Sequence, residues 1–216
     1  MHIRTCTPVR EKKMSLVLAS LKKAEKFADI TEIWLDEIYD LDLKKLISAA
    51  KKPVLAKGSF ALVSSALEAG ADFIDIDIEQ KNLKKHLTAL KKLRRESGAR
   101  GKIIVSYHNF TSTPDIKELL QKTDSAFKAG ADIVKIAITI KDFGDNAVLL
   151  ELVYHLRAKR KNIICVGMGE KGKLSRIMTP LLGGYLTYVA LDKSRKTAPG
   201  QLTISEFKKY LADLNL

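Results

Sequence analysis

Short β-prone segments alternate with amphipathic helical segments along the whole chain, and this alternation restricts the possible folds more than any other feature of the sequence. Several β-prone segments, such as IIVSY at 103–107 and IVKIAI at 133–138, are almost continuously apolar. Parallel strands that are covered on both faces have this composition. The alternation therefore predicts an α/β protein built on a parallel sheet. The predicted strands are His2–Cys6, Glu32–Asp36, Pro53–Lys57, Phe73–Glu79, Lys102–His108, Ile133–Thr139, Asn162–Met168 and Tyr185–Leu191.

The segments between these strands show apolar residues at helical spacing. The predicted helices are Ser15–Phe27, Leu43–Ala50, Ala61–Ala69, Leu83–Arg95, Asp115–Ala129, Asn146–Lys159 and Ile204–Leu214. Eight strands in 216 residues leave about 27 residues for each βα unit, which is compact but sufficient. Eight units favour a closed barrel over an open doubly wound sheet, and no G-x-G-x-x-G follows the first strand. We therefore predict a single (β/α)8 TIM barrel that occupies residues 1–216 as one domain.

Two kinds of signal mark helix ends. In Thr113-Pro114-Asp115 the threonine suits an N-cap and the proline suits the first helical position, so we predict that a helix begins there. Gly70 and Gly130 each follow a predicted helix and precede Ala-Asp and a strand. A glycine at this place adopts the left-handed backbone conformation that ends many helices.

The chain is strongly basic, with a net charge of +13 and a pI of about 9.6. Such a charge makes nucleic acid and anionic metabolites the partners to consider. The lysines are scattered, often in pairs such as Lys22–Lys23 and Lys208–Lys209, over the polar faces of predicted helices. This distribution favours a solvated surface, with attraction of an anionic metabolite as the second interpretation. We predict no nucleic-acid partner, because scattered lysines with few aromatic residues make a poor recognition surface.

Cysteine usage and hydropathy restrict the location and the cofactors. Cys6 and Cys165 lie in apolar strand segments, so we predict two buried small side chains. The sequence offers too few ligands at suitable spacing for a metal site. The longest apolar runs are too short to cross a bilayer, and residues 1–10 lack the apolar core of a secretory signal. We therefore predict a cytoplasmic protein that has no membrane partner and no metal.

Lys135 is the sharpest candidate among the polar residues at the C-terminal strand ends, where barrel active sites lie. It stands in ADIVKIAI between apolar residues, although lysine is rarely buried. Strand alternation sends Lys135 into the barrel if Val134 and Ile136 pack against the helices. Desolvation there is expected to lower the pKa of the amine and to favour the neutral nucleophile. A structural lysine paired with a barrel carboxylate is the alternative, and these residues alone leave both open.

Two further features lie near Lys135 in the predicted barrel. His108 ends the strand before Lys135, and its ordinary pKa of about 6.5 suits proton transfer, although a histidine at a strand end is often structural. The segment FIDIDIE alternates strictly, so Asp75, Asp77 and Glu79 share one face, which we predict to be the barrel interior. These carboxylates either neutralise interior lysines or orient His108.

Four motifs together identify a family. They are SYHNFTSTP at 106–114, GADIVKIAI at 130–138, GMGEKGKLSRI at 167–177 and TAPGQLTI at 197–204. With these motifs in this order, the sequence resembles type I 3-dehydroquinate dehydratase, the Schiff-base enzyme of the shikimate pathway. FIDIDIE and EIWLD fit more loosely. The resemblance covers nearly the whole chain, and the combination is specific although no single motif is sufficient.

The resemblance implies that the protein is an enzyme, a lyase of the hydro-lyase class. The family dehydrates 3-dehydroquinate to 3-dehydroshikimate by syn elimination, in aromatic amino-acid biosynthesis and without metal or organic cofactor. Lys135 is implied to form the imine with the substrate ketone. His108 is implied to take the C2 proton and then to assist loss of water and hydrolysis of the imine. The expected partner is a small anionic substrate, and a homodimer is common in the family, although nothing in the sequence marks an interface.

The resemblance also implies a substrate site. Arg176 would bind the substrate carboxylate with its planar guanidinium. Gln201, in a loop able to close as a lid, would contact the carboxylate end or a hydroxyl, and Thr197 would keep a hydroxyl contact where the family often has serine. Glu32 matches the acidic residue of the family's E-x-R pattern. The predicted substrate-binding residues are thus Glu32, Lys57, Arg176, Thr197 and Gln201.

The chain departs from the family pattern at the substrate shell. The E-x-R pattern reads Glu32-Ile33-Trp34, so its arginine is missing. The third strand runs into KPVLAKGSFALVSS, which lacks both the usual arginine and the Glu-Gly-Gly loop whose carboxylate orients the catalytic histidine. Lys57 is the candidate to replace the missing charge, and Asp77 or Glu79 the candidate to replace the carboxylate.

Two interpretations of these departures are open. Retention of Lys135, His108, Arg176 and Gln201 favours an active dehydratase with a rebuilt substrate shell over a Schiff-base enzyme with a changed substrate. A rival hypothesis for the whole chain is a class I aldolase for phosphorylated sugars, which would use glycines after strands 7 and 8 as a phosphate cradle. The aldolase hypothesis leaves the A-P-G-Q segment unexplained.

Overall fold

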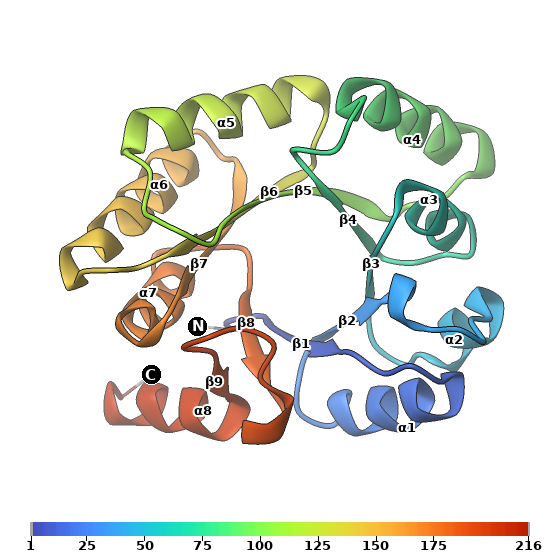
Figure 1. Ribbon diagram of the computed structural model, residues 1–216, viewed down its shortest axis with the longest axis horizontal. Coiled ribbons are helices and arrows are strands. Elements are labelled where there is room, and N and C mark those ends of the chain that lie inside the picture. Colours follow the sequence, from blue (N-terminus) through green and yellow to red (C-terminus); the bar gives the residue numbers. More distant parts are fainter. Residues whose placement is uncertain (1, 216) are drawn as a thin grey trace.

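A computed structural model of the protein describes residues 2–215. It is a TIM barrel in which strands alternate with helices around a central ring, as Figure 1 shows, and the predicted fold class is confirmed. The strands are β1 (Thr5–Val9), β2 (Ile30–Trp34), β3 (Val54–Lys57), β4 (Phe73–Asp77), β5 (Lys102–Asn109), β6 (Ile133–Thr139), β7 (Asn162–Met168), β8 (Thr187–Ala190) and β9 (Leu202–Thr203). The helices are α1 (Met14–Ala24), α2 (Leu43–Ala49), α3 (Phe60–Glu68), α4 (Leu83–Ser97), α5 (Ile116–Ala129), α6 (Asn146–Ala158), α7 (Lys173–Leu181) and α8 (Ile204–Asp213).

All strand pairings of the sheet are parallel, in the order β7-β6-β5-β4-β3-β2-β1-β8-β9. The ring closes between β7 and β8, where the N–H of Tyr185 donates to the carbonyl oxygen of Ile163 at 2.7 Å. The two-residue strand β9, which the sequence did not predict, extends the sheet beside β8. It connects the loop of residues 192–201 directly to α8.

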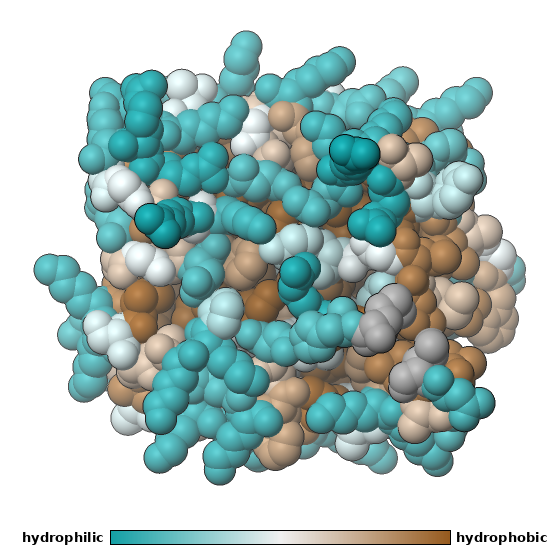
Figure 2. All heavy atoms as spheres, turned by 180° about the vertical axis from the view of Figure 1, so that it is seen from behind, coloured by the Kyte–Doolittle hydropathy of each residue, from teal (hydrophilic) through white to brown (hydrophobic). Residues whose placement is uncertain are grey.

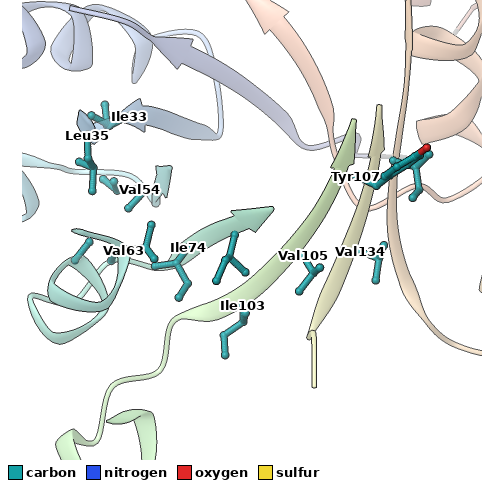
Figure 3. Packing of buried hydrophobic residues seen from close by; sticks show 14 of the residues in the cluster. Ile33, Leu35, Val54, Val63, Ile74, Ile103, Val105, Tyr107 and Val134 are labelled. Carbon is teal, nitrogen blue, oxygen red and sulfur yellow. The ribbon is translucent and has the colours of Figure 1, made fainter. Parts of the chain in front are cut away.

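Apolar side chains form separate layers outside and inside the ring. The outer layer lies between the strands and the helices, and Figure 3 shows strand residues such as Ile33, Val105 and Val134 within it. The inner layer lies inside the ring and consists of Cys6, Ile30, Leu55, Phe73, Ile104, Ile133, Ala137, Ile164, Val166, Leu186 and Tyr188. Val134 and Ile136 belong to the outer layer, so alternation points Lys135 into the barrel, as predicted.

Several predicted element bounds are confirmed and others are wrong. β6 and β7 have the predicted bounds. β1 covers Thr5–Val9 instead of His2–Cys6 and includes Pro8. The ladder with β2 continues to Val9, but the ladder with β8 ends at Cys6, so Pro8 pairs on one side only, where a proline is tolerated. The sequence did not predict α7, a short helix that carries Pro180 in its last turn.

The predicted helix start at Thr113-Pro114 is also wrong. α5 begins at Ile116, and the side chain of Asp115 caps it by accepting a hydrogen bond from the N–H of Glu118 at 2.9 Å. The hydroxyl of Thr113 instead donates to the carbonyl oxygen of Thr139 at the end of β6. Gly130 ends α5 with φ of 116°, as predicted.

The surface and the cysteines agree with the sequence-based interpretation. Cys6 and Cys165 are both buried. Figure 2 shows hydrophilic side chains spread over the face opposite to that of Figure 1, with hydrophobic atoms between them. None of the helices described for residues 2–215 combines the length and the apolarity that a membrane crossing needs.

Candidate active site

A cavity of about 410 Å³ opens at the C-terminal ends of the barrel strands. It is lined by every residue that the sequence predicted for catalysis or substrate binding: Glu32, Lys57, His108, Lys135, Arg176, Thr197 and Gln201. Parallel strands that curl into a ring place these side chains together although they come from distant parts of the chain. The structure thus brings the predicted residues together in one cavity and shows their contacts.

Lys135 lies at the floor of the cavity and is 5% exposed. Its Nζ is 3.1 Å from Oδ2 of Asp75 and 3.5 Å from Oε2 of Glu32. The same nitrogen lies 4.4 Å from the ring centroid of Tyr188, at cation–π distance. These contacts hold Lys135 as an ammonium ion.

The predicted direction of the pKa shift at Lys135 is therefore wrong. Burial does lower the pKa of the amine, but the negative charges of Asp75 and Glu32 outweigh burial and raise it above its ordinary value. The sequence indicated that the amine of Lys135 is buried, but it did not show which carboxylates lie close enough to interact with it. In the substrate-free protein Lys135 is therefore an ion-paired lysine, which was the alternative interpretation of this residue.

Asp75 is the closer partner of Lys135 and is itself buried. Burial raises the pKa of this carboxyl, but the charge of Lys135 and then that of Lys57 outweigh it and bring the pKa to about 2. Its second oxygen, Oδ1, is buried and has no hydrogen-bond partner among residues 2–215. A buried acceptor without a partner is costly, and the charge of Lys135 is the largest of the interactions that offset the burial of Asp75.

Glu32 accepts two hydrogen bonds from aromatic side chains. The indole Nε1–H of Trp34 donates to Oε1 at 2.8 Å, and the hydroxyl of Tyr188 donates to Oε2 at 2.7 Å. Both are shorter than the contact between Glu32 and Lys135. Trp34, which stands where the family pattern has arginine, thus binds the acidic residue of that same pattern.

His108 is oriented by a carboxylate on the neighbouring strand. Its Nδ1 lies 3.3 Å from Oδ2 of Asp77, and its ring stacks on Phe110. Burial raises the pKa of Asp77, but hydrogen bonds from His108 and from the N–H of Glu79 outweigh it and lower the pKa. Between the two predicted candidates, Asp77 is the carboxylate that contacts the histidine. Nε2 is then left for chemistry in the cavity.

His108 and Lys135 point to the same interior because of the strand register. Ser106 is the partner of Lys135 in the ladder between β5 and β6, and His108 lies two residues further along β5. Side chains two residues apart on a strand share a face. The imidazole therefore stands above the amine, nearer to the mouth of the barrel.

Arg176 is 1% exposed, yet it lines the cavity. Its Nε donates to the carbonyl oxygen of Gly167 at 2.8 Å, and its Nη2 lies 3.5 Å from that of Pro199. No carboxylate among residues 2–215 neutralises it, and burial lowers its pKa to about 10. A buried guanidinium without a counter-ion is suited to bind an anionic ligand in bidentate geometry.

Thr197 and Gln201 are bonded to each other in the loop between β8 and β9. Oε1 of Gln201 accepts from the N–H of Thr197 at 2.7 Å and from its hydroxyl at 3.2 Å. The loop is fixed to the segment after β7, where the N–H of Gly169 donates to Pro199 at 3.0 Å. Gly200 has φ of +72°, and a side chain there would collide with the carbonyl oxygen of Gly169.

The rim of the cavity carries a cationic and aromatic group that the sequence suggested only in part. Lys57 Nζ lies 4.7 Å from the centroid of the Trp34 ring, and the Arg10 guanidinium lies 4.1 Å from it. Arg10 also forms an ion pair with Glu37. Lys57 thus supplies positive charge at the rim of the cavity, where a replacement for the missing arginine was expected. It also forms a cation–π contact with Trp34.

Sequence reasoning missed two residues of the site. Tyr188 contacts both Glu32 and Lys135, and Phe110 stacks on His108. Alternation along β8 could have placed Tyr188 in the interior, but nothing local distinguishes it from a packing residue. Phe110 lies in the S-x-H-x-F motif, which was the available signal.

The fold, with a buried amine at the floor of its cavity, is that of a TIM-barrel enzyme, and comparison with known proteins identifies the family. A family model described as type I 3-dehydroquinase matches residues 49–215. A 3-dehydroquinate dehydratase of Methanococcus maripaludis is 34% identical over an alignment of 226 residues that covers 97% of this chain and 99% of the relative. The chain belongs to the type I 3-dehydroquinase family.

Solved structures agree with this assignment at the level of the fold. The 3-dehydroquinate dehydratase of Geobacillus kaustophilus superposes with a TM-score of 0.86 at 23% identity, covering 100% of this chain and 92% of that one. That of Aquifex aeolicus gives 0.77 at 26% identity, with 98% of both chains covered. The predicted family is confirmed, and with it the prediction of a hydro-lyase of the shikimate pathway.

Proposed function

We propose that this protein dehydrates 3-dehydroquinate to 3-dehydroshikimate through an imine on Lys135, with His108 as the acid and base. The observation that carries the proposal is the position of Lys135: a buried amine at the floor of a cavity whose walls bear a carboxylate-oriented imidazole and an unneutralised guanidinium. An active dehydratase with a rebuilt substrate shell accounts for all three groups.

The ion pairs of Lys135 favour the imine even though they oppose the free amine. Condensation of an ammonium ion with a ketone gives a protonated imine and water, so the positive charge at Nζ is the same before and after. Asp75 and Glu32, at 3.1 and 3.5 Å, therefore stabilise the iminium as they stabilise the ammonium. The cost falls on the attack itself, which requires transient loss of one proton from Nζ.

His108 serves as the base of the elimination. With Nδ1 held by Asp77, Nε2 is the nitrogen that takes the proton from the carbon next to the iminium. The iminium accepts the electron pair as an enamine. The histidine then returns this proton to the departing hydroxyl, so water leaves from the same face and the iminium re-forms. Attack by water releases the product and the amine.

Arg176 binds the substrate carboxylate, and the pair of Thr197 and Gln201 binds a hydroxyl. The substrate carboxylate neutralises the buried charge of Arg176. Because the cost of burying this charge is already present in the free protein, the new ion pair contributes to binding. Fixing the carboxylate also selects the proton that faces His108. Lys57 and Glu32 complete the polar lining.

The test is an assay of enone formation from 3-dehydroquinate by the wild type, Lys135→Met and His108→Ala. The wild type is expected to turn over. Lys135→Met is expected to lose all measurable activity, and His108→Ala about 10²–10⁴-fold. Lys171→Met, at an exposed lysine outside the cavity, is the control. Full activity of Lys135→Met would rule out the imine, and an inactive, folded wild type would point to a changed substrate.

A further inference from the structure

The carboxylate of Glu32 is shared between one charged and two neutral partners. Trp34 donates to Oε1 at 2.8 Å and Tyr188 to Oε2 at 2.7 Å, while Lys135 lies 3.5 Å from Oε2. The two aromatic donors thus take the shorter bonds. Asp75 differs, because its Oδ2 contacts Lys135 at 3.1 Å and its other oxygen has no hydrogen-bond partner in the described part of the chain.

We propose that Trp34 and Tyr188 are positioning residues that increase the nucleophilicity of Lys135 by drawing the negative charge of Glu32 away from its Nζ. This inference rests on the proposed function of Lys135. Hydrogen bonds to a carboxylate stabilise its charge and reduce the potential that it exerts nearby. The amine loses a proton for attack more readily as this potential falls, while Asp75 retains its full interaction.

Titratable groups on five other strands of the barrel face Lys135. They are Cys6 on β1, Glu32 on β2, Asp75 on β4, His108 on β5 and Tyr188 on β8, with Lys57 on β3 beside Asp75. Burial raises the pKa of the Cys6 thiol and of the Tyr188 hydroxyl well above their ordinary values, so both are neutral. Negative charge at the amine therefore comes from Glu32 and Asp75, and only the carboxylate of Glu32 has aromatic donors.

Trp34 is held in place for this role. Arg10 and Lys57 lie over its ring at 4.1 and 4.7 Å from the centroid, and Arg10 is anchored by Glu37. The indole N–H is a donor without charge. In the family pattern this position is an arginine. Here Trp34 keeps a hydrogen-bond donor beside Glu32, and the positive charges of Arg10 and Lys57 lie over the indole ring instead.

The experiment measures acetylation of Lys135 by acetic anhydride at pH 8, located by mass spectrometry, because this reaction needs no substrate. Tyr188→Phe and Trp34→Phe each remove one donor and keep an aromatic ring. Each is expected to raise the pKa of the amine by about 0.5–1 unit and to slow acetylation about 3–10-fold. Tyr107→Phe, at a tyrosine of the outer layer, is the matched control and is expected to leave the rate unchanged.

Glu32→Gln is expected to change the acetylation rate in the opposite direction, and it keeps the inference testable if the aromatic variants misfold. It removes the charge itself, so acetylation of Lys135 is expected to become faster. Trp34→Phe replaces the indole by a smaller ring, which widens the cavity and gives the reagent easier access to Lys135. Easier access would speed acetylation. Slower acetylation in this variant therefore cannot be explained by a change of access.

The outcomes separate this inference from the proposed function. Unchanged or faster acetylation in both aromatic variants, or slower acetylation in Glu32→Gln, would overturn the inference. Failure of 3-dehydroquinate to react with the wild type, while acetylation follows the expected order, would count against the proposed function alone.

Discussion

Nδ1 of His108 lies 3.3 Å from Oδ2 of Asp77, so a residue of strand β4 orients the histidine in a chain that lacks the family's loop carboxylate. Asp77 is the register partner of Ser106, and His108 lies two residues beyond Ser106. The carboxylate thus approaches from the neighbouring strand, and a rigid sheet rather than a loop fixes the imidazole.

Asp77→Asn is expected to lower kcat about 10–100-fold, because an amide no longer stabilises the imidazolium that forms during proton transfer. The measurement is the initial rate of enone formation at saturating substrate. Glu79→Gln is the matched control, since Glu79 also lines the cavity but forms no bond to His108 in the structure. A greater loss in Glu79→Gln than in Asp77→Asn would contradict this assignment of the orienting carboxylate.

The pair of Asp75 and Lys135 predicts a specific dependence of stability on pH. The pKa of Asp75 is about 2 in the folded protein, below its unfolded value of about 3.9. A lowered carboxyl pKa stabilises the fold above the unfolded pKa, and this contribution is lost as the pH falls through the folded pKa. The full contribution amounts to about 2–3 kcal/mol, and part of it remains at pH 2.5, which is above the folded pKa.

Urea unfolding between pH 6 and pH 2.5 tests this dependence. The difference in unfolding free energy between the wild type and Asp75→Asn is expected to shrink by about 2 kcal/mol over this range. Asp124→Asn, at an exposed carboxylate, is the control and is expected to show no such trend. A difference that stays constant with pH would contradict the coupling to Lys135.

Arg176→Met is expected to separate binding from stability. Loss of the bidentate contact should lower kcat/KM at least 100-fold, since a charged hydrogen-bonded pair contributes several kcal/mol. The unfolding temperature of the free variant should be equal to or above that of the wild type, because the buried charge has no counter-ion. Thermal unfolding with and without a small carboxylic acid checks this: only the wild type should be stabilised by the ligand.

Gly200→Ala tests whether the loop between β8 and β9 must lie against the segment after β7. The added methyl group would collide with Gly169, so the loop that holds Thr197 and Gln201 is expected to open and kcat/KM to fall about 10-fold or more. Gly98→Ala is the matched control, because Gly98 has the same φ of +72° but no atom within 4 Å of an added Cβ. It should cost about 1 kcal/mol of stability and no activity. Equal loss of activity in both variants would contradict the role of the contact.

The sequence predicted the fold wherever periodicity was unbroken. β6 and β7, the most apolar strands, have their predicted bounds, whereas β1 is shifted toward Val9 and includes Pro8. Helix α7 was missed because its motif was interpreted as a binding segment. Local patterns do not show where a strand ladder ends, which is what makes Pro8 acceptable in β1.

The site was predicted as a set of residues but not as an electrostatic system. Alternation predicted that Lys135 and Asp75 face the interior, and the motifs marked His108, Arg176, Thr197 and Gln201, but no pattern marked Tyr188. The sign of the pKa shift at Lys135 depends on distances of 3.1 and 3.5 Å to two carboxylates on other strands. Such distances follow from the register and curvature of the closed sheet, which no local pattern encodes.

The imine on Lys135 is tested by reduction of the protein with borohydride in the presence of 3-dehydroquinate, followed by peptide mass spectrometry. One covalent adduct is expected, on the peptide that contains Lys135, formed by the wild type and by His108→Ala but not by Lys135→Met. An adduct on Lys57 instead, or no adduct in a folded protein that dehydrates the substrate, would contradict this expectation.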